Sequence, residues 1–230
     1  MELAIDTSTE TAGIALSSAG TVTAEFTWHA GQNHTVELVP NLNHLLAQSE
    51  FELQDIKGVI VAKGPGSFNG LRVGMSFAKG LALSLNIPIV GVSTLEADAF
   101  PYSATNLPIC PIMNAGRGEI ATAVFQKKRG KWQRLIEEHI STASALALQI
   151  KTKTIFCGKI PPEIALYLKE TLKQKATFID VTAQLPRVGY LAQLGWKRLE
   201  KGDYDNISTL EPLYLRRPAI TINKKIGIKA

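Results

Sequence analysis

Hydrophobic and polar residues alternate along the start of the chain. Three short stretches, Leu3 to Asp6, Ala12 to Ser17 and Val22 to Trp28, follow a period of two and are separated by turn-forming residues. This period is typical of strands with one buried face. The sequence therefore predicts a three-stranded antiparallel meander.

The period then changes to the one that is typical of helices. Apolar residues recur at helical spacing from Val36 to Leu46, which predicts a helix that Pro40 should kink. A buried strand at Val59 to Ala62 and a long apolar helix from about Leu71 to Leu85 come next. Pro88 to Val92 indicates another short strand.

A helix start and a connection complete the first half. Ser93 or Thr94 can cap a further helix, and Glu96 is placed to support that cap. Polar residues between Pro101 and Pro108 interrupt both periods and favour a connection between two lobes.

The second half repeats the same order of elements in reduced form. The predicted elements are strands at 109–113, 121–125 and 132–137, a helix at 143–150, a strand at 154–157, a helix begun by Pro161 and Pro162, a strand at 177–181 and a helix at 189–199. We expect an α/β protein of two lobes, each a mixed sheet with helices. Residues 1–104 would form the N-terminal lobe, 105–207 the C-terminal lobe and 208–230 an extended basic tail.

Composition indicates an ordinary globular protein. With 230 residues, of which 45% are apolar, the chain is long enough to bury a full core. It has no apolar run of the roughly 18 to 20 residues that a membrane span needs, and we expect it in the cytoplasm, away from membranes. Cys110 and Cys157 match no zinc or redox spacing and are expected to be buried, reduced thiols.

The net charge of +5 is unevenly distributed. Residues 216–230 contain five basic residues and no acidic one, so the rest of the chain is neutral. A second local excess comprises Lys127, Lys128, Arg129, Lys131 and Arg134. It fits either a solvated hairpin tip or a patch that touches phosphates.

Two segments carry candidate chemistry. Asp6-Thr7-Ser8 lies in a tight turn after the first strand, where a carboxylate and two hydroxyls could meet a phosphate or a metal-bound water. The run from Gly64 to Gly74 leaves a buried strand and enters a helix that Asn69 could cap. Such a loop can expose amide hydrogens to an anion, or its glycines can simply permit close packing. The candidate residues of this anion or nucleotide loop are Asp6, Thr7, Ser8, Gly64, Gly66, Ser67 and Arg72.

These segments resemble one family. Asp6-Thr7-Ser8, Asn33-His34-Thr35, the run from Gly64 to Gly74 and Pro212-Leu213-Tyr214-Leu215-Arg216 are together similar to the TsaB (YeaZ-type) family. The resemblance implies an actin/Hsp70-like (ASKHA, ribonuclease H-like) fold. It also implies a role in making threonylcarbamoyladenosine beside the anticodon of tRNAs that read codons starting with A. In that role a TsaB protein scaffolds and activates its catalytic paralogue TsaD and helps to recruit the ATPase TsaE, and tRNA is reached through the complex.

The resemblance also implies where the TsaD partner would bind. TsaB proteins pair with TsaD through helices of the N-terminal lobe, and the helix from Leu71 to Leu85 is apolar over more than one face. Without its partner, such a chain could form a homodimer through the same surface. The expected interface residues are His34, Val39, Leu42, Leu46, Met75, Phe77 and Leu81.

Three features argue against catalysis by this chain alone. Leu38 stands where metal-binding relatives would have a second histidine four residues after His34. Neutral Asn114 opens the second lobe, where a phosphotransferase of this fold needs a second aspartate. Gly158 is a lone glycine where an adenosine loop has a pair. We therefore expect no catalytic or metal-binding residues and no firm cofactor, with weak nucleotide binding left open.

Two alternatives remain at this point. The chain could be a stand-alone ATP-dependent enzyme of the actin/Hsp70-like superfamily that acts on a small molecule. It could also be a free RNA-binding module, although only 7% of its residues are aromatic and its body is neutral.

Overall fold

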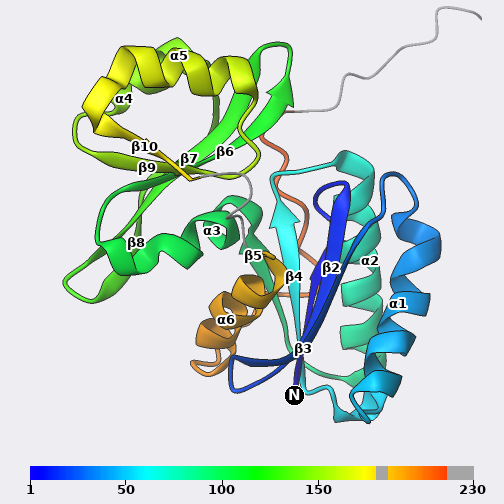
Figure 1. Ribbon diagram of the computed structural model, residues 1–230. Coiled ribbons are helices and arrows are strands. Elements are labelled where there is room, and N and C mark those ends of the chain that lie inside the picture. Colours follow the sequence, from blue (N-terminus) through cyan, green and yellow to red (C-terminus); the bar gives the residue numbers. More distant parts are fainter. Residues whose placement is uncertain (180–185, 217–230) are drawn as a thin grey trace, which may run out of the picture.

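The computed structural model describes residues 1–179 and 186–216 of the chain, and Figure 1 shows two lobes. Each lobe is built on a mixed five-stranded sheet with helices against it. Cys110 and Cys157 are free and buried, as predicted. Among the described residues, no helix is long and apolar enough to cross a membrane.

The first sheet has the strand order β3-β2-β1-β4-β5. Its strands are β1 (Glu2–Asp6), β2 (Thr11–Ser18), β3 (Thr21–His29), β4 (Gly58–Gly64) and β5 (Ile89–Ser93). β1 pairs antiparallel with β2 and parallel with β4, and β2 pairs antiparallel with β3, which confirms the meander. β1 is buried along its whole length, whereas β3, at the edge, alternates between exposed residues and half-buried ones such as Phe26 and Trp28 that pack against the core.

Both faces of the first sheet are covered. Helices α1 (His34–Gln48) and α2 (Phe68–Leu85) bury one face together with Leu3 and Ile5. Helix α6 (Val188–Leu199) buries the opposite face against Ala4 and Ile60. The alternation of side chains along β1 thus separates two cores.

The second sheet repeats the first. Its order, β10-β9-β6-β7-β8, matches that of the first sheet when β6 is placed on β1 and β7 on β2. Helices α4 (Ala143–Gln149) and α5 (Pro162–Leu172) pack on one face. The strands are β6 (Ile109–Gly116), β7 (Glu119–Lys128), β8 (Lys131–Ser141), β9 (Thr154–Cys157) and β10 (Ala176–Phe178).

The third helix of each repeat connects the two lobes. α3 (Thr94–Ala99) follows β5, yet Leu95 and Ala99 pack in the core of the second sheet. α6 comes after β10, yet it packs on the first sheet. The predicted range 105–207 is therefore not one packed unit, because α6 belongs with the N-terminal core. Only the tertiary structure could reveal this exchange, since both helices follow the expected sequence period.

The caps of two helices differ in part from prediction. Ser67, and not Asn69, caps α2, because its hydroxyl accepts a hydrogen bond from the Gly70 amide. Ser93 caps α3, but the Glu96 carboxylate accepts from Trp132 instead of supporting that cap. α1 continues through Pro40. The short 3-10 helices are η1 (Leu53–Asp55), η2 (Phe100–Thr105) and η3 (Lys173–Lys175).

The segment after α6 crosses the surface of the first lobe. The Asp205 carboxylate accepts from the Gly91 amide, Leu210 is buried, and the Leu213 amide donates to Lys63 O over 2.6 Å. An ion pair between Arg216 and Glu119 then reaches the second lobe. The basic tail beyond residue 216 lies outside the described residues.

Candidate functional site

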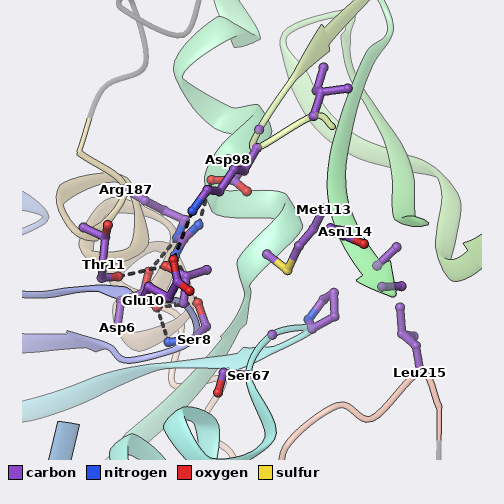
Figure 2. Close-up of a pocket in the computed structure, with 18 of the residues that line it drawn as sticks. Asp6, Ser8, Glu10, Thr11, Ser67, Asp98, Met113, Asn114, Arg187 and Leu215 are labelled. Carbon is purple, nitrogen blue, oxygen red and sulfur yellow. Dashed lines mark hydrogen bonds and ion pairs between the residues drawn. The ribbon is translucent and has the colours of Figure 1, made fainter. Parts of the chain in front are cut away.

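A cleft of 1280 Å³ separates the lobes where β1 ends. Asp6 and Ser8 from the first lobe, Asn114 from the second and Arg187 from the start of α6 all line it. Figure 2 shows that Asp6, Ser8, Asp98 and Arg187 gather at one point of this cleft. The Asp6-Thr7-Ser8 turn that the sequence singled out thus lies at the inter-lobe cleft.

Arg187 occupies the polar face of that turn. Its guanidinium donates to the Asp6 carboxylate over 2.5 Å and to the Asp98 carboxylate over 3.0 Å. It also donates to the hydroxyls of Ser8, over 3.0 Å, and Thr9, over 3.3 Å. The carboxylate that could have organised a metal or phosphate is therefore already paired with a cation of the same chain.

Burial makes this pairing strong. The side chains of Asp6, Asp98 and Arg187 are 3%, 14% and 15% exposed. Burial alone would raise the pKa of Asp6, but Arg187 and the hydrogen bonds from Ser8 outweigh it and hold the pKa below its usual value. Burial raises the pKa of Asp98 despite Arg187, and the negative charge of Asp6 adds to that rise. Burial would lower the pKa of Arg187, but the two carboxylates raise it.

The glycines of the loop serve close packing against the first turn. A Cβ atom on Gly66 would clash with Ser8 O, one on Gly70 with Thr7 O, and one on Gly74 with the Thr7 hydroxyl. Gly70 and Gly74 are four residues apart and share one face of α2, and Gly66 lies just before the helix begins. This face lets the helix approach the backbone of the Asp-Thr-Ser turn.

Some amide donors of this loop already have partners within the chain. The Ser67 amide donates to Ser8 O over 2.7 Å, and the Gly70 amide donates to the Ser67 hydroxyl over 3.3 Å. The Thr7 hydroxyl donates to Gly70 O over 2.7 Å. Gly64, the other predicted loop residue, has a φ of +107° and packs against Leu213 of the surface segment. Packing within the chain therefore explains the glycines of the run from Gly64 to Gly74.

Arg72 lies away from the Asp6 turn. Its guanidinium carbon lies 3.9 Å from the centroid of the Phe68 ring, and its Nε donates to the Tyr214 hydroxyl over 3.2 Å. Tyr214 also contacts Phe68, with ring centroids 5.0 Å apart. Arg72 therefore fastens the surface segment to the start of α2.

The matching position in the second lobe carries no charge. Asn114 is exposed, and its side-chain oxygen accepts from the Gly116 amide over 2.8 Å. Gly158 lies so close to the chain that a Cβ there would be 2.6 Å from Ile112 O. Within residues 1–179 and 186–216, no group of three His, Cys, Asp or Glu residues could hold a metal ion.

Most of the predicted interface residues lie in the core. His34 is buried, and its Nε2 lies 2.8 Å from Thr9 O. Val39 is 44% exposed and Phe77 is half-buried. The helical spacing alone could not show which of two adjacent rows of apolar residues is buried. In addition to His34, the predicted interface residues that are buried are Leu42, Leu46, Met75 and Leu81.

Sequence reasoning missed Arg187 and Asp98. Asp98 lies within a short helix, and Arg187 lies just before α6, so neither stands in a recognisable motif. A lone Arg before an apolar helix gives no sequence signal of a buried ion pair.

Comparisons with known proteins agree with this architecture. Residues 28–224 match the family model described as TsaD, tRNA N6-adenosine threonylcarbamoyltransferase. The chain is 38% identical over 219 residues to tRNA threonylcarbamoyladenosine biosynthesis protein TsaB of Bacillus subtilis, covering 93% of each chain. It is also 38% identical over 227 residues to the Escherichia coli protein of that name, covering 93% of this chain and 94% of that one.

Solved structures support the fold. YeaZ from Pseudomonas aeruginosa superposes with a TM-score of 0.79 at 23% identity, covering 93% of this chain and 99% of that one. The activator of the 2-hydroxyisocaproyl-CoA dehydratase from Clostridium difficile, solved with bound ADPNP, gives 0.51 at 12% identity, covering 89% and 98%. The resemblance drawn from the sequence and the expected actin/Hsp70-like fold are both confirmed. The chain belongs to the TsaB family of tRNA threonylcarbamoyladenosine biosynthesis proteins.

Proposed function

We propose that this chain is a non-catalytic subunit that holds a TsaD-family enzyme in its active form during tRNA threonylcarbamoylation. The observation that carries the proposal is the pairing of Asp6 with Arg187 over 2.5 Å. An actin/Hsp70-like phosphotransferase needs its first aspartate for metal and water. Here that carboxylate is neutralised within the chain, which favours a binding role over chemistry.

The proposed partner surface is the outer face of α1 and α2. Val36 is 69% exposed, Val39 44% and Leu83 63%. These apolar side chains are exposed on the two helices, and a partner could bury them favourably. The proposed surface consists of these exposed residues and half-buried Phe77. Val39 and Phe77 were also predicted from the sequence, whereas the other predicted interface residues are buried and do not belong to it. We infer that the same face mediates a homodimer when the partner is absent and that the complex also receives the TsaE ATPase in the cytoplasm.

Size-exclusion chromatography with light scattering tests this proposal. The chain should form a one-to-one complex with its cognate TsaD-family protein. Val39→Glu should abolish the complex, because it would bury an unpaired charge in an apolar interface. Leu166→Glu on α5 is the matched control: Leu166 is 58% exposed, and its substitution should leave the complex intact. Failure of the wild-type chain to associate, with nucleotide and the TsaE-family protein present, would overturn the proposal.

The alternative of a stand-alone ATP-dependent enzyme has a separate test. It predicts ATP turnover by the isolated chain that disappears in Asp6→Ala. We expect no turnover above the rate of a blank sample. Turnover that depends on Asp6 would support the enzyme and contradict the proposed role of Arg187.

A further inference from the structure

Basic side chains from both lobes gather on the side of the molecule away from α1 and α2. Four of them, Lys127, Lys128, Arg129 and Lys131, flank the turn between β7 and β8, and Lys197 and Lys201 lie at the end of α6. Five are exposed, and Lys127 is half-buried. We call these six residues the lysine patch.

Aromatic contacts hold the two parts of the patch together. Trp132 is the cross-strand neighbour of Lys127 in the β7–β8 hairpin. Its ring lies 5.4 Å from that of Phe100, and the Lys197 ammonium lies 4.1 Å from the Phe100 centroid. Trp132 also stacks on Phe125, with ring centroids 5.7 Å apart and planes at 6°. The hairpin is thereby packed toward α6, so the patch is not a free hairpin tip.

The patch keeps its positive charge. Arg134 is excluded from it because Glu96, Glu137 and Glu138 pair with that guanidinium. In the part of the chain that the structure describes, no carboxylate forms a salt bridge with any of the six residues. Glu200 is the acidic residue that lies between Lys197 and Lys201 in the sequence.

The titration of Lys197 agrees with this clustering. Partial burial lowers the pKa of Lys197, and the positive charges of Lys127 and Lys201 lower it further, whereas Glu96 and Glu200 act in the opposite direction. Like charges from the hairpin and from the helix end therefore act on one ammonium group.

The patch would remain accessible in the proposed complex. α6 packs on the face of the first sheet opposite to α1 and α2, as Figure 1 shows. A partner on the outer face of α1 and α2 would leave α6 and the β7–β8 hairpin exposed to solvent.

We propose that the lysine patch binds the phosphate backbone of the tRNA substrate. This inference rests on the proposed function, since it assumes that the chain works within a tRNA-modifying complex. Flexible ammonium groups suit a phosphate backbone, because they act as mobile point charges and need no fixed base geometry. The neutral remainder of the chain would make this contact local, and the contact would position tRNA without reading its sequence.

The test measures binding of a fluorescently labelled, unmodified tRNA transcript by anisotropy at several KCl concentrations. The protein is the complex of the full chain with its TsaD-family partner, after chromatography has shown that the complex forms. The triple variant Lys128→Gln, Lys131→Gln and Lys201→Gln removes three exposed charges without touching the Phe100 contact. We expect about tenfold weaker binding near 100 mM salt and a log–log salt slope that is shallower by about 2 to 3.

A control triple variant removes the same charge elsewhere. Lys151, Lys153 and Lys173 are exposed near the starts of β9 and β10, and their change to Gln should leave affinity and slope close to those of the wild type. Equal losses in both triples would overturn the proposal, because binding would then follow net charge alone. Unchanged tRNA binding by the patch variant would also overturn it. If that variant bound tRNA normally but no longer bound the TsaE-family protein, the patch would be a binding surface for an acidic protein and the tRNA proposal would be wrong. Failure of the complex to form would contradict the proposed function and leave the isolated chain as the sample.

Discussion

The two lobes share one strand order but differ at the cleft they form together. In the first lobe, Asp6 at the end of β1 is buried and paired with Arg187. In the second, Asn114 in the equivalent strand β6 is exposed and accepts only a local hydrogen bond from Gly116. A repeated fold therefore does not repeat its chemistry. One lobe keeps a neutralised carboxylate, and the other has no charge at the corresponding place.

The third helices add a second contrast. α3 belongs to the first repeat and packs on the second sheet, whereas α6 belongs to the second repeat and packs on the first. Arg187 stands at the start of α6 and pairs with Asp98 of α3. The ion-pair cluster thus joins the two exchanged helices to the end of β1. The cluster therefore stabilises the packing of the two lobes against each other.

The largest expected effect comes from removing the cation of the first lobe. Arg187→Met should lower the free energy of unfolding by about 3–5 kcal/mol, because it leaves two buried carboxylates without their partner. Urea denaturation followed by circular dichroism measures this loss. Lys159→Met is the control, since its pair with Glu10 is 79% and 65% exposed and should contribute about 0–1 kcal/mol. A loss below about 1 kcal/mol for Arg187→Met would mean that the buried ion pairs of Asp6 and Asp98 contribute no more than an exposed pair, and that the first lobe does not depend on Arg187.

Packing of α2 against the first turn gives the next largest effect. Gly70→Ala should destabilise the protein by about 1–3 kcal/mol, because the added methyl group would clash with backbone oxygen Thr7 O. Gly80→Ala, on the same helix, meets no atom within 4 Å and should stabilise by about 0.5–1 kcal/mol. Urea midpoints of the two variants give the comparison. The same sign for both would refute the packing explanation of the glycine run.

The pH dependence of Arg187→Met should show a smaller effect. In the wild type, the lowered pKa of Asp6 provides stability that is fully present above its unfolded value of about 3.8 and is lost as the pH falls through the folded value. Without Arg187, burial raises the pKa of both Asp6 and Asp98. The folded variant then binds protons at a higher pH than the unfolded chain does, so the variant gains stability on acidification. The difference in free energy of unfolding between the wild type and the variant, the deficit, should therefore shrink from pH 7 to pH 5. A deficit that is constant across this range would argue against charged carboxylates as its cause.

The smallest effect should come from the second lobe. Asn114→Asp introduces a second carboxylate at the cleft, yet it should change the free energy of unfolding by less than about 0.5 kcal/mol, because the side chain is exposed and still accepts from Gly116. The variant should also show no tight binding of Mg²⁺ and ATP while Asp6 stays paired with Arg187. Calorimetric titration with Mg²⁺ and ATP checks this. Tight binding by the single variant would show that the second lobe alone limits the chemistry.

Most of the fold could be predicted because each element carries its own period. The alternation in Ala12 to Ser17 and the helical spacing from Val36 to Leu46 each predict a structure that local sequence is sufficient to form. The candidate site was predicted only in part. The Asp6 turn and the glycine run were identified, but their contact and its purpose were not, since packing and anion binding use the same glycines. Five of the seven predicted interface residues, His34 among them, are buried, because helical spacing does not show which apolar row faces the core.

The sequence by itself determined the element order, the repeated lobes, the family and the absence of a second aspartate at Asn114. These follow from local periods and from residues that are contiguous in the chain. Only the tertiary structure decided that α3 and α6 exchange sheets, that Arg187 neutralises Asp6, and that Lys197 joins the lysines of the β7–β8 hairpin. Asp6 and Arg187 are 181 positions apart. No local pattern specifies such a pair, because its energy depends on burial that exists only once both sheets and the helices between them are packed.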